Sequence, residues 1–185
     1  MTKLDRVTSR ATCFTARNVD TDRIIPARFL KRIDKVGFGD LLFADLKPAE
    51  VFNVPDARNR QVLIAGPNFG CGSSREHAVW AIRDFGFRVV ISTSFADIFK
   101  ENSLKNGVLT VELDEATHQK LADVFKKNPE EQMTVDLPAQ KIQFGGVQAT
   151  FNVNSFSKTC LLEGLDELGY ILRHDPQIAA FEKSR

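Results

Sequence analysis

The sequence contains little cysteine, and the cysteines it has are spaced neither as disulfide partners nor as a metal motif. Cys13, Cys71 and Cys160 are the only three, and no Cys-x-x-Cys pair occurs. An odd number of widely separated cysteines argues against the disulfide framework of a small secreted domain, so reduced thiols are expected. Three cysteines are enough in principle to ligate an iron–sulfur cluster, but Cys13 and Cys160 lie in apolar runs typical of core positions. We therefore expect this chain to hold no metal and no cofactor of its own.

The sequence also lacks a long apolar run and an excess of charge of one sign. No apolar stretch approaches the roughly 20 residues that span a bilayer, and residues 1–6 lack the apolar core of a signal peptide. The 25 basic and 24 acidic side chains nearly cancel, which gives no support to binding of nucleic acid or of an anionic membrane. We expect a cytoplasmic protein that recognises its substrate through local charges.

Strand-like and helix-like patterns alternate along the chain, as is typical of a layered α/β domain. With 185 residues, 43% of them hydrophobic, and no internal repeat, the chain is expected to form one domain spanning residues 1–185. A hairpin is expected at Gly145 and Gly146. Periodicity and turn residues predict strands at 11–16, 61–65, 88–92, 109–113, 133–137, 141–144 and 150–153. They predict helices at 74–85, 114–127, 155–165 and 176–183, and a further short helix that starts at Ser94 or Asp97 and ends near Gly107.

Residues 66–77, with the sequence GPNFGCGSSREH, form the most informative segment of the chain. They follow a predicted strand and precede a predicted helix, and their glycines let a ligand approach the main chain closely. Ser73 or Ser74 then falls at the helix N-cap, where N–H groups and the positive end of the helix dipole favour a carboxylate, a phosphate or a developing alkoxide. Arg75 adds a planar fork of donors that matches a carboxylate. We predict an active-site loop here, called the serine loop below.

Two other interpretations of the serine loop stay open on these residues alone. Ser73 or Ser74 can simply cap the helix, with Glu76 completing a capping box when Ser73 is the cap. The loop can also bind a phosphate, although the Gly-Lys-Ser/Thr ending of a P-loop and the Gly-x-Gly-x-x-Gly spacing of a dinucleotide site are both missing. A non-catalytic anion-binding module is thus an alternative to an enzyme.

Five segments resemble a single protein family. Residues 68–78 resemble the serine-bearing loop of the swivelling domain of the aconitase superfamily, and residues 18–26 and 94–103 resemble two further signatures of that domain. Residues 164–166 and 178–182 resemble the tail of one branch, the small subunits of the isopropylmalate dehydratases. The resemblance covers nearly the whole chain and implies a three-layer β/β/α swivelling domain with a mixed sheet, present as a separate polypeptide.

The resemblance implies a two-chain hydro-lyase that is active only with a large subunit carrying a [4Fe–4S] cluster. The implied reaction is the isomerisation of 2-isopropylmalate and 3-isopropylmalate by dehydration and rehydration in leucine biosynthesis. Related hydro-lyases acting on citraconate, 2-methylmalate or homoaconitate use the same serine loop. The choice among these hydroxy-diacid substrates therefore stays open.

The resemblance also assigns roles to individual residues of the serine loop. It makes Ser73 the base that removes a proton from the substrate, and it has Ser74 and Arg75 bind the substrate. This chemistry explains the motif, because a serine hydroxyl is a poor base unless aimed N–H groups stabilise its alkoxide. The residues expected to support the loop are Gly70, Gly72, His77, Asp20 and Asp22.

Residues 28–40 correspond to the substrate-recognition loop of the resembling family, whereas their composition alone is that of a solvated loop. In that family, apolar side chains of this loop meet the variable group of the substrate and an arginine binds its remote carboxylate. Arg28 and Arg32 are the candidates for that arginine. The apolar candidates are Leu30, Ile33, Val36 and Phe38.

The sequence also allows expectations about one acidic run and two histidines. The run Asp20-Thr21-Asp22 offers carboxylate oxygens to a hard cation, but turn and cap chemistry explains it equally well, and we expect no metal there. His118 and His174 are expected to face solvent on their helices.

Overall fold

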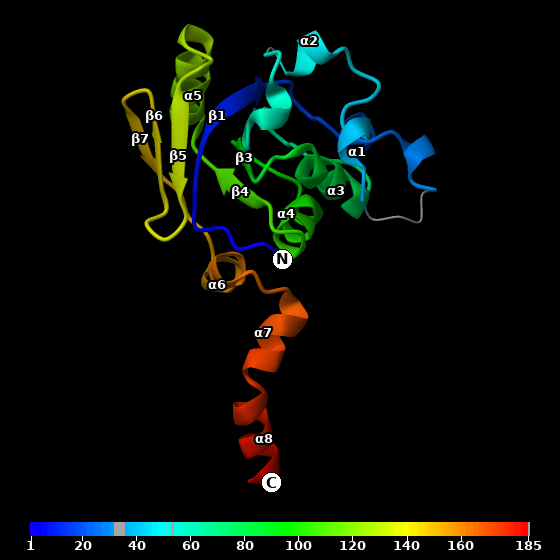
Figure 1. Ribbon diagram of the computed structural model, residues 1–185, viewed down its shortest axis with the longest axis vertical. Coiled ribbons are helices and arrows are strands. Elements are labelled where there is room, and N and C mark those ends of the chain that lie inside the picture. Colours follow the sequence, from blue (N-terminus) through cyan, green and yellow to red (C-terminus); the bar gives the residue numbers. More distant parts are fainter. Residues whose placement is uncertain (32–35, 53, 185) are drawn as a thin grey trace.

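The computed structural model describes residues 1–31, 36–52 and 54–184, and its strands form one mixed sheet of seven (Figure 1). The strand order across the sheet is β4-β3-β2-β1-β5-β6-β7. The strands are β1 (Arg6–Phe14), β2 (Val62–Ala65), β3 (Val89–Ser92), β4 (Leu109–Glu112), β5 (Gln132–Asp136), β6 (Lys141–Phe144) and β7 (Val147–Thr150).

The long strand β1 joins a parallel half of the sheet to an antiparallel half. Its residues 11–14 pair in parallel with β2, and β3 and β4 continue the parallel half. Its residues 6–10 pair with β5, and β6 and β7 continue the antiparallel half. One strand therefore belongs to both halves.

Helices α3 and α5 pack on opposite faces of the parallel half, whereas α7 and α8 extend away from the body of the molecule (Figure 1). Within the described ranges, no helix combines the length and apolarity that crossing a bilayer requires. The helices are α1 (Thr21–Ile24), α2 (Pro48–Val51), α3 (Glu76–Phe85), α4 (Asp97–Lys105), α5 (Glu115–Lys127), α6 (Ser155–Glu163), α7 (Glu167–Arg173) and α8 (Asp175–Lys183), with 3₁₀ turns at Ala27–Phe29, Gly39–Leu41 and Ala57–Asn59.

Both faces of the parallel half are covered, which is why strand β2 is apolar at every position. Leu63 and Ala65 point into a core shared with α3, whereas Val62 and Ile64 point into a core shared with α5 and the antiparallel strands. The antiparallel half thus forms one layer, the parallel strands a second and the helices around α3 a third. The expected α/β architecture with a mixed sheet is confirmed.

Most predicted elements are found within a few residues of their expected bounds, but β1 begins five residues earlier than expected, and the one-turn helices α1 and α2 lie in segments where no helix was expected. Two further differences have local causes. The last short strand, expected at 150–153, is β7, because the tight turn at Gly145 and Gly146 starts the return strand at once. Helix α7 was not predicted, since Gly169 lowers helix propensity in its centre. The Asp166 side chain compensates by capping the helix, accepting a hydrogen bond from the Gly169 N–H at 2.7 Å.

Candidate functional site

Three loops meet at one edge of the sheet because they follow the carboxyl ends of the neighbouring parallel strands β1, β2 and β3. Main-chain hydrogen bonds join the loops directly. The Phe69 N–H donates to the Ser94 carbonyl at 3.2 Å, and the Ala96 N–H donates to the Phe69 carbonyl at 3.2 Å. The Gly70 N–H donates to the Val19 carbonyl at 2.8 Å. The serine loop is therefore held from both sides by the two other segments that resemble family signatures.

Thr21 fixes the main chain at the serine itself. Its N–H donates to the Cys71 carbonyl at 3.0 Å, and its hydroxyl donates to the Ser73 carbonyl at 2.9 Å. The Ser73 side chain is exposed, and its hydroxyl makes no hydrogen bond within the described part of the chain. A fixed main chain with an available hydroxyl suits a reactive group. Sequence reasoning assigned no role to Thr21, although it lies in residues 18–26, one of the segments that resemble the family.

The three loops enclose a hollow of about 220 Å³ in front of Ser73. This volume is below the roughly 300–1,000 Å³ of pockets for drug-sized ligands, so the hollow fits a small molecule or one end of a larger one. The residues that line it are Thr21, Gly70, Gly72, Ser73, Ser74, Arg75, Ala96, Asp97, Ile98, Phe99 and Asn102. Three of the predicted substrate contacts, Ser73, Ser74 and Arg75, thus come together here.

The prediction that Ser73 or Ser74 caps the following helix is wrong. Helix α3 begins at Glu76, and its N-cap residue is Arg75, which makes no capping bond with its side chain. The reason is tertiary: the Ser73 carbonyl is bonded to Thr21, so the chain turns into the helix two residues later than the local pattern indicates. Both serines are left in the loop, beside the N-terminal end of the helix.

The Arg75 guanidinium is oriented by an ion pair with the Asp22 carboxylate. The Arg75 side chain is 19% exposed and that of Asp22 is 51% exposed. Asp20 has a different task, because its carboxylate caps α1 by accepting from the Arg23 N–H at 2.8 Å. The cap interpretation of this run is therefore correct. Within the described ranges, no group of three or more His, Cys, Asp or Glu side chains is arranged to hold a metal ion.

Gly70 and Gly72 adopt backbone conformations that other residues rarely take, with φ values of +75° and +84°. A Cβ atom on Gly70 would lie 2.2 Å from Cγ of Phe99. A Cβ atom on Gly72 would lie 3.3 Å from Cβ of Asp20. Both glycines are thus needed for the shape of the loop, and Gly70 the more strictly.

His77 lies in the first turn of α3 and does not line the hollow. Its ring is 4.5 Å from that of Trp80 and 5.5 Å from that of Phe38, measured between centroids. Burial lowers the pKa of His77, while the neighbouring charge of Glu76 raises it and that of Arg75 lowers it. The ring packs the beginning of α3 against the end of the recognition segment.

Residues 28–40, expected to form the substrate-recognition loop and called the recognition segment here, are only partly described. Arg32 and Ile33 lie outside the described residues. Phe38 was expected to be available to a substrate, but it is fully buried between His77 and Trp80, so this expectation is wrong. Val36 is exposed, whereas Leu30 packs partly against the core.

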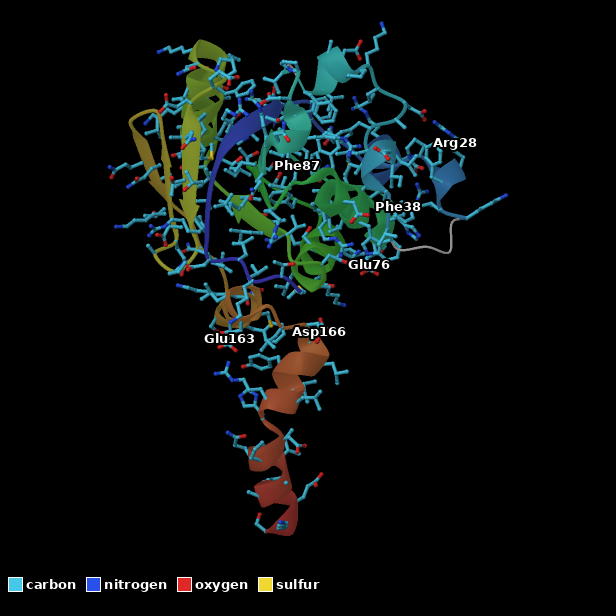
Figure 2. All side chains as sticks on the ribbon, viewed as in Figure 1. Arg28, Phe38, Glu76, Phe87, Glu163 and Asp166 are labelled. Atoms are coloured by element: carbon cyan, nitrogen blue, oxygen red, sulfur yellow. The ribbon has the colours of Figure 1, made fainter. Side chains whose placement is uncertain are left out.

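Arg28 does not lie at the hollow. Its guanidinium pairs with the two carboxylate oxygens of Asp45 at 2.7 and 2.5 Å, and this carboxylate raises the pKa of Arg28. Figure 2 shows Arg28 at the outer edge of the molecule, away from Glu76 at the start of α3. A role of Arg28 in binding a carboxylate stays a prediction.

Two buried side chains hold the strand end from which the serine loop departs. His118 Nε2 lies 2.8 Å from the Ala65 carbonyl, and the Ser92 hydroxyl donates to the Gly66 carbonyl at 2.7 Å. Burial lowers the pKa of His118, and its bond to Ala65 partly opposes that shift. The expectation that His118 faces solvent is wrong. The signal was present, since His118 precedes the core residue Leu121 by three positions on α5.

Comparison with known proteins defines the class of this chain. Residues 1–116, which include every residue that lines the hollow, match the family model of the aconitase C-terminal domain. The chain is 49% identical to the 3-isopropylmalate dehydratase small subunit of Rubrobacter xylanophilus, covering 100% of this chain and 96% of that protein. It is 51% identical to the protein of the same name from Solibacter usitatus, covering 95% of this chain and 91% of that one.

A solved structure gives the same result. The crystal structure of a 3-isopropylmalate dehydratase from Methanocaldococcus jannaschii is similar with a TM-score of 0.72 and 25% identity, covering 95% of this chain and 98% of that chain. The chain belongs to the family of 3-isopropylmalate dehydratase small subunits.

Proposed function

We propose that this chain is the small subunit of a two-chain hydro-lyase that interconverts 2-isopropylmalate and 3-isopropylmalate in the cytoplasm, as a step of leucine biosynthesis. We also propose that residues 1–185 act as one swivelling domain. The observation that carries the proposal is the meeting of Ser73, Ser74 and Arg75 at one hollow of about 220 Å³, within the segment that matches the aconitase domain.

Ser73 is proposed as the base and acid of the reaction. The substrate carries a hydrogen next to a carboxylate, and removing it requires a base within hydrogen-bond reach. The alkoxide form of the exposed Ser73 takes this proton on dehydration and becomes the neutral hydroxyl, which returns the proton on rehydration. Its alkoxide is stabilised by the positive end of α3 and by the Arg75 charge, both within three residues along the chain.

Ser74 and Arg75 are proposed to hold the substrate while the proton moves. A guanidinium can donate two parallel hydrogen bonds to one carboxylate, which fixes both its position and its angle. Asp22 restricts the guanidinium before substrate binds, so less orientation is lost on binding. Arg28 or Arg32 is proposed to bind the remote carboxylate from the recognition segment.

The cysteines of this chain do not fit an iron–sulfur cluster. Cys13 and Cys160 are buried, and burial raises the pKa of both thiols, that of Cys13 to about 11, which disfavours the thiolate that ligates iron. Cys71 alone lies in the loop. We therefore propose that the [4Fe–4S] cluster belongs to the large subunit, where a bound iron supplies Lewis-acid polarisation of the departing hydroxyl.

The test is anaerobic turnover by this chain reconstituted with the large subunit from its own source. Preferred turnover of 3-isopropylmalate that needs both chains would support the proposal. Preference for citraconate or homoaconitate would keep the mechanism and replace the substrate. Ligand binding by this chain alone, with no turnover of any diacid after the cluster has been checked, would favour an anion-binding module instead.

Substitutions at the two serines test the assignment of roles. Ser73→Ala should lower kcat by about 10²–10⁴-fold, the usual contribution of a general base, while assembly with the large subunit is retained. Ser74→Ala is the matched neighbour and should raise KM more than it lowers kcat, since its proposed role is binding. A Ser73→Ala enzyme with nearly unchanged kcat would remove the base assignment.

A further inference from the structure

The two C-terminal helices form an arm that extends away from the body of the molecule (Figure 1). Neither α7 nor α8 contains a buried residue. Eight large hydrophobic side chains are exposed in the described part of the chain, and five of them belong to the arm. These five are between 40 and 63% exposed: Leu168, Ile171, Leu172, Ile178 and Phe181.

The exposed side chains of α7 share one face of that helix. Leu168, Ile171 and Leu172 have the spacing i, i+3, i+4, which places side chains on the same side of an α-helix. Single exposed hydrophobic residues are ordinary on protein surfaces, but a cluster of large ones indicates a contact surface. We call this face of α7 the apolar face of the arm.

The opposite side of α7 is fastened to the body. The Tyr170 ring meets the Phe156 ring edge to face at a centroid distance of 4.9 Å. Arg173 pairs with Glu163, at the junction shown in Figure 2, and Lys105 of α4 lies 3.5 Å from the Glu167 carboxylate. The arm is thus presented in a fixed orientation, which lowers the entropy lost on docking.

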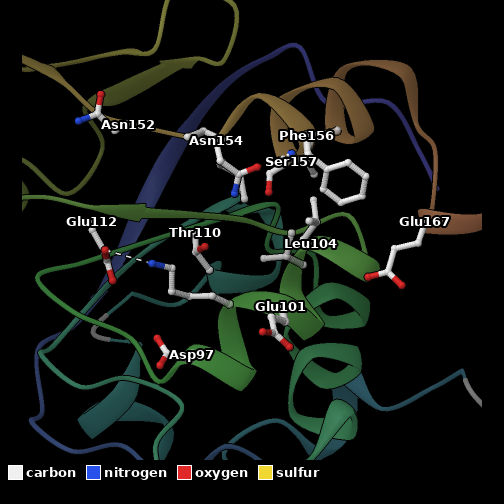
Figure 3. Close-up of a pocket in the computed structure, with 15 residues that line it drawn as sticks. Asp97, Glu101, Leu104, Thr110, Glu112, Asn152, Asn154, Phe156, Ser157 and Glu167 are labelled. Atoms are coloured by element: carbon white, nitrogen blue, oxygen red, sulfur yellow. Dashed lines mark hydrogen bonds and ion pairs between the residues drawn. The ribbon is translucent and has the colours of Figure 1, made fainter. Parts of the chain in front are cut away.

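A groove of about 710 Å³ runs beside the base of the arm, between α4 and residues 152–157 (Figure 3). Its floor is apolar, with Leu104, Phe156 and Leu161 among its lining side chains. Its charges are mostly acidic: Asp97, Glu101, Glu112 and Glu167 stand against Lys100, which lies 3.2 Å from Glu112. A partner seated here is expected to present basic and apolar side chains.

Helix α4 connects this groove to the serine hollow. Asp97, at its first turn, lines both, and the neighbouring Ile98 is also exposed. Lys105, at its last turn, contacts the arm. With nine residues, α4 is about 13 Å long at 1.5 Å per residue. A single partner chain that covers the hollow can therefore reach the arm along one continuous surface.

We propose that the apolar face of the arm is the docking surface for the large subunit, an inference that rests on the proposed function. The aconitase domain model ends at residue 116, whereas the relatives named small subunits match the whole chain, arm included. A subunit on a separate chain has no linker to raise its effective concentration, so it needs contact surface of its own. A second copy of this chain on the arm would bring no cluster to the hollow, because the cysteines of this chain do not fit one.

The test uses the full chain with three substitutions, Leu168→Gln, Ile171→Gln and Leu172→Gln. None of these side chains is buried, and glutamine is a good helix former, so the fold and circular dichroism should be unchanged. The Kd for the cluster-bearing large subunit, measured by anaerobic calorimetry, should weaken about 100-fold or more. At saturating large subunit, kcat should stay within about twofold, because the arm does not line the hollow.

A matched control carries Gln177→Ala, Glu182→Ala and Lys183→Ala, three polar changes on the same arm. Its Kd should stay within about threefold of the unchanged chain. An unaltered Kd for the apolar-face variant would overturn the inference. If the isolated unchanged chain self-associates in sedimentation and the apolar-face variant does not, while the Kd for the large subunit is unaltered, the inference is also overturned. The partner of the apolar face would then be a second copy of this chain. If the unchanged chain binds the large subunit tightly but the complex turns over no diacid, the proposed function is refuted. The Kd values of the variants would still test the docking surface.

Discussion

Replacing Gly70 by alanine adds a methyl group where the Phe99 ring already lies. The new Cβ would be 2.2 Å from Cγ, 2.4 Å from Cδ2 and 2.7 Å from Cβ of Phe99. Real Cβ atoms do not approach other atoms so closely, and Phe99 is itself buried against Phe69, with ring centroids 5.5 Å apart. The serine loop or the ring must therefore move.

The magnitude follows from two separate contributions. A non-glycine residue in the left-handed region costs about 1–2 kcal/mol, and Gly70 has a φ of +75°. Forcing extra volume into a packed site adds about 1–3 kcal/mol. Gly146 provides the control, because its φ is +81° but a Cβ there would have no atom within 4 Å. Gly146→Ala should therefore lose only the first contribution.

Thermal unfolding of the two variants measures the difference. One kcal/mol corresponds to about 2–4 °C for a chain of this size, so Gly70→Ala should melt about 2–12 °C below Gly146→Ala. In the reconstituted enzyme, Gly70→Ala should also lower kcat/KM, because the same displacement moves Ser73. Equal melting temperatures for the two glycine variants would refute the steric argument.

Three further outcomes are expected. Arg60 is fully buried and donates to Asp56 and to the Ala11 carbonyl at 2.8 and 2.9 Å. Arg60→Met should lower the free energy of unfolding in urea by about 1–3 kcal/mol, because the Ala11 carbonyl loses its donor, and an unchanged free energy of unfolding would contradict this. Burial lowers the pKa of His118 below its ordinary 6.5, so its contribution to stability is complete above that pH and is lost as the pH falls through the lowered value. His118→Gln should therefore flatten the acid side of the stability profile, and an unchanged slope would disprove the assignment. Asp22→Asn should release the guanidinium it orients and raise KM severalfold with little change in melting temperature, whereas an unaltered KM would deny Asp22 that role.

Local sequence patterns predicted most of the fold because short-range geometry decides the elements concerned. The apolar run Val62–Ala65 becomes a strand covered on both faces. Asp114 caps α5 by accepting from the Thr117 N–H at 2.9 Å, as an aspartate before an amphipathic helix should. The glycine pair in the hairpin supplies the positive φ values that its turn requires.

Local patterns failed where a distant residue competes for the same group. Ser73 is not a cap, since Thr21, 52 positions earlier, already binds its carbonyl. His118 is not exposed, because α5 packs over the end of β2 and brings the ring to the Ala65 carbonyl, 53 positions away. Phe38 is not available to a substrate, since His77 and Trp80 enclose it.

The sequence by itself determined the chemistry of the site and the order of the elements, because a glycine-rich loop with two serines and an arginine states its donors and acceptors directly. Only the tertiary structure decided which distant groups surround that loop. The order β3-β2-β1 brings the carboxyl ends of three parallel strands together, and so sets Thr21 and Asp22 beside Ser73 and Arg75. The physical reason is the distance along the chain over which each pattern acts. The periodicity that predicts a helix or strand involves only a few neighbouring residues, whereas the strand order depends on the burial of apolar surface from the whole chain.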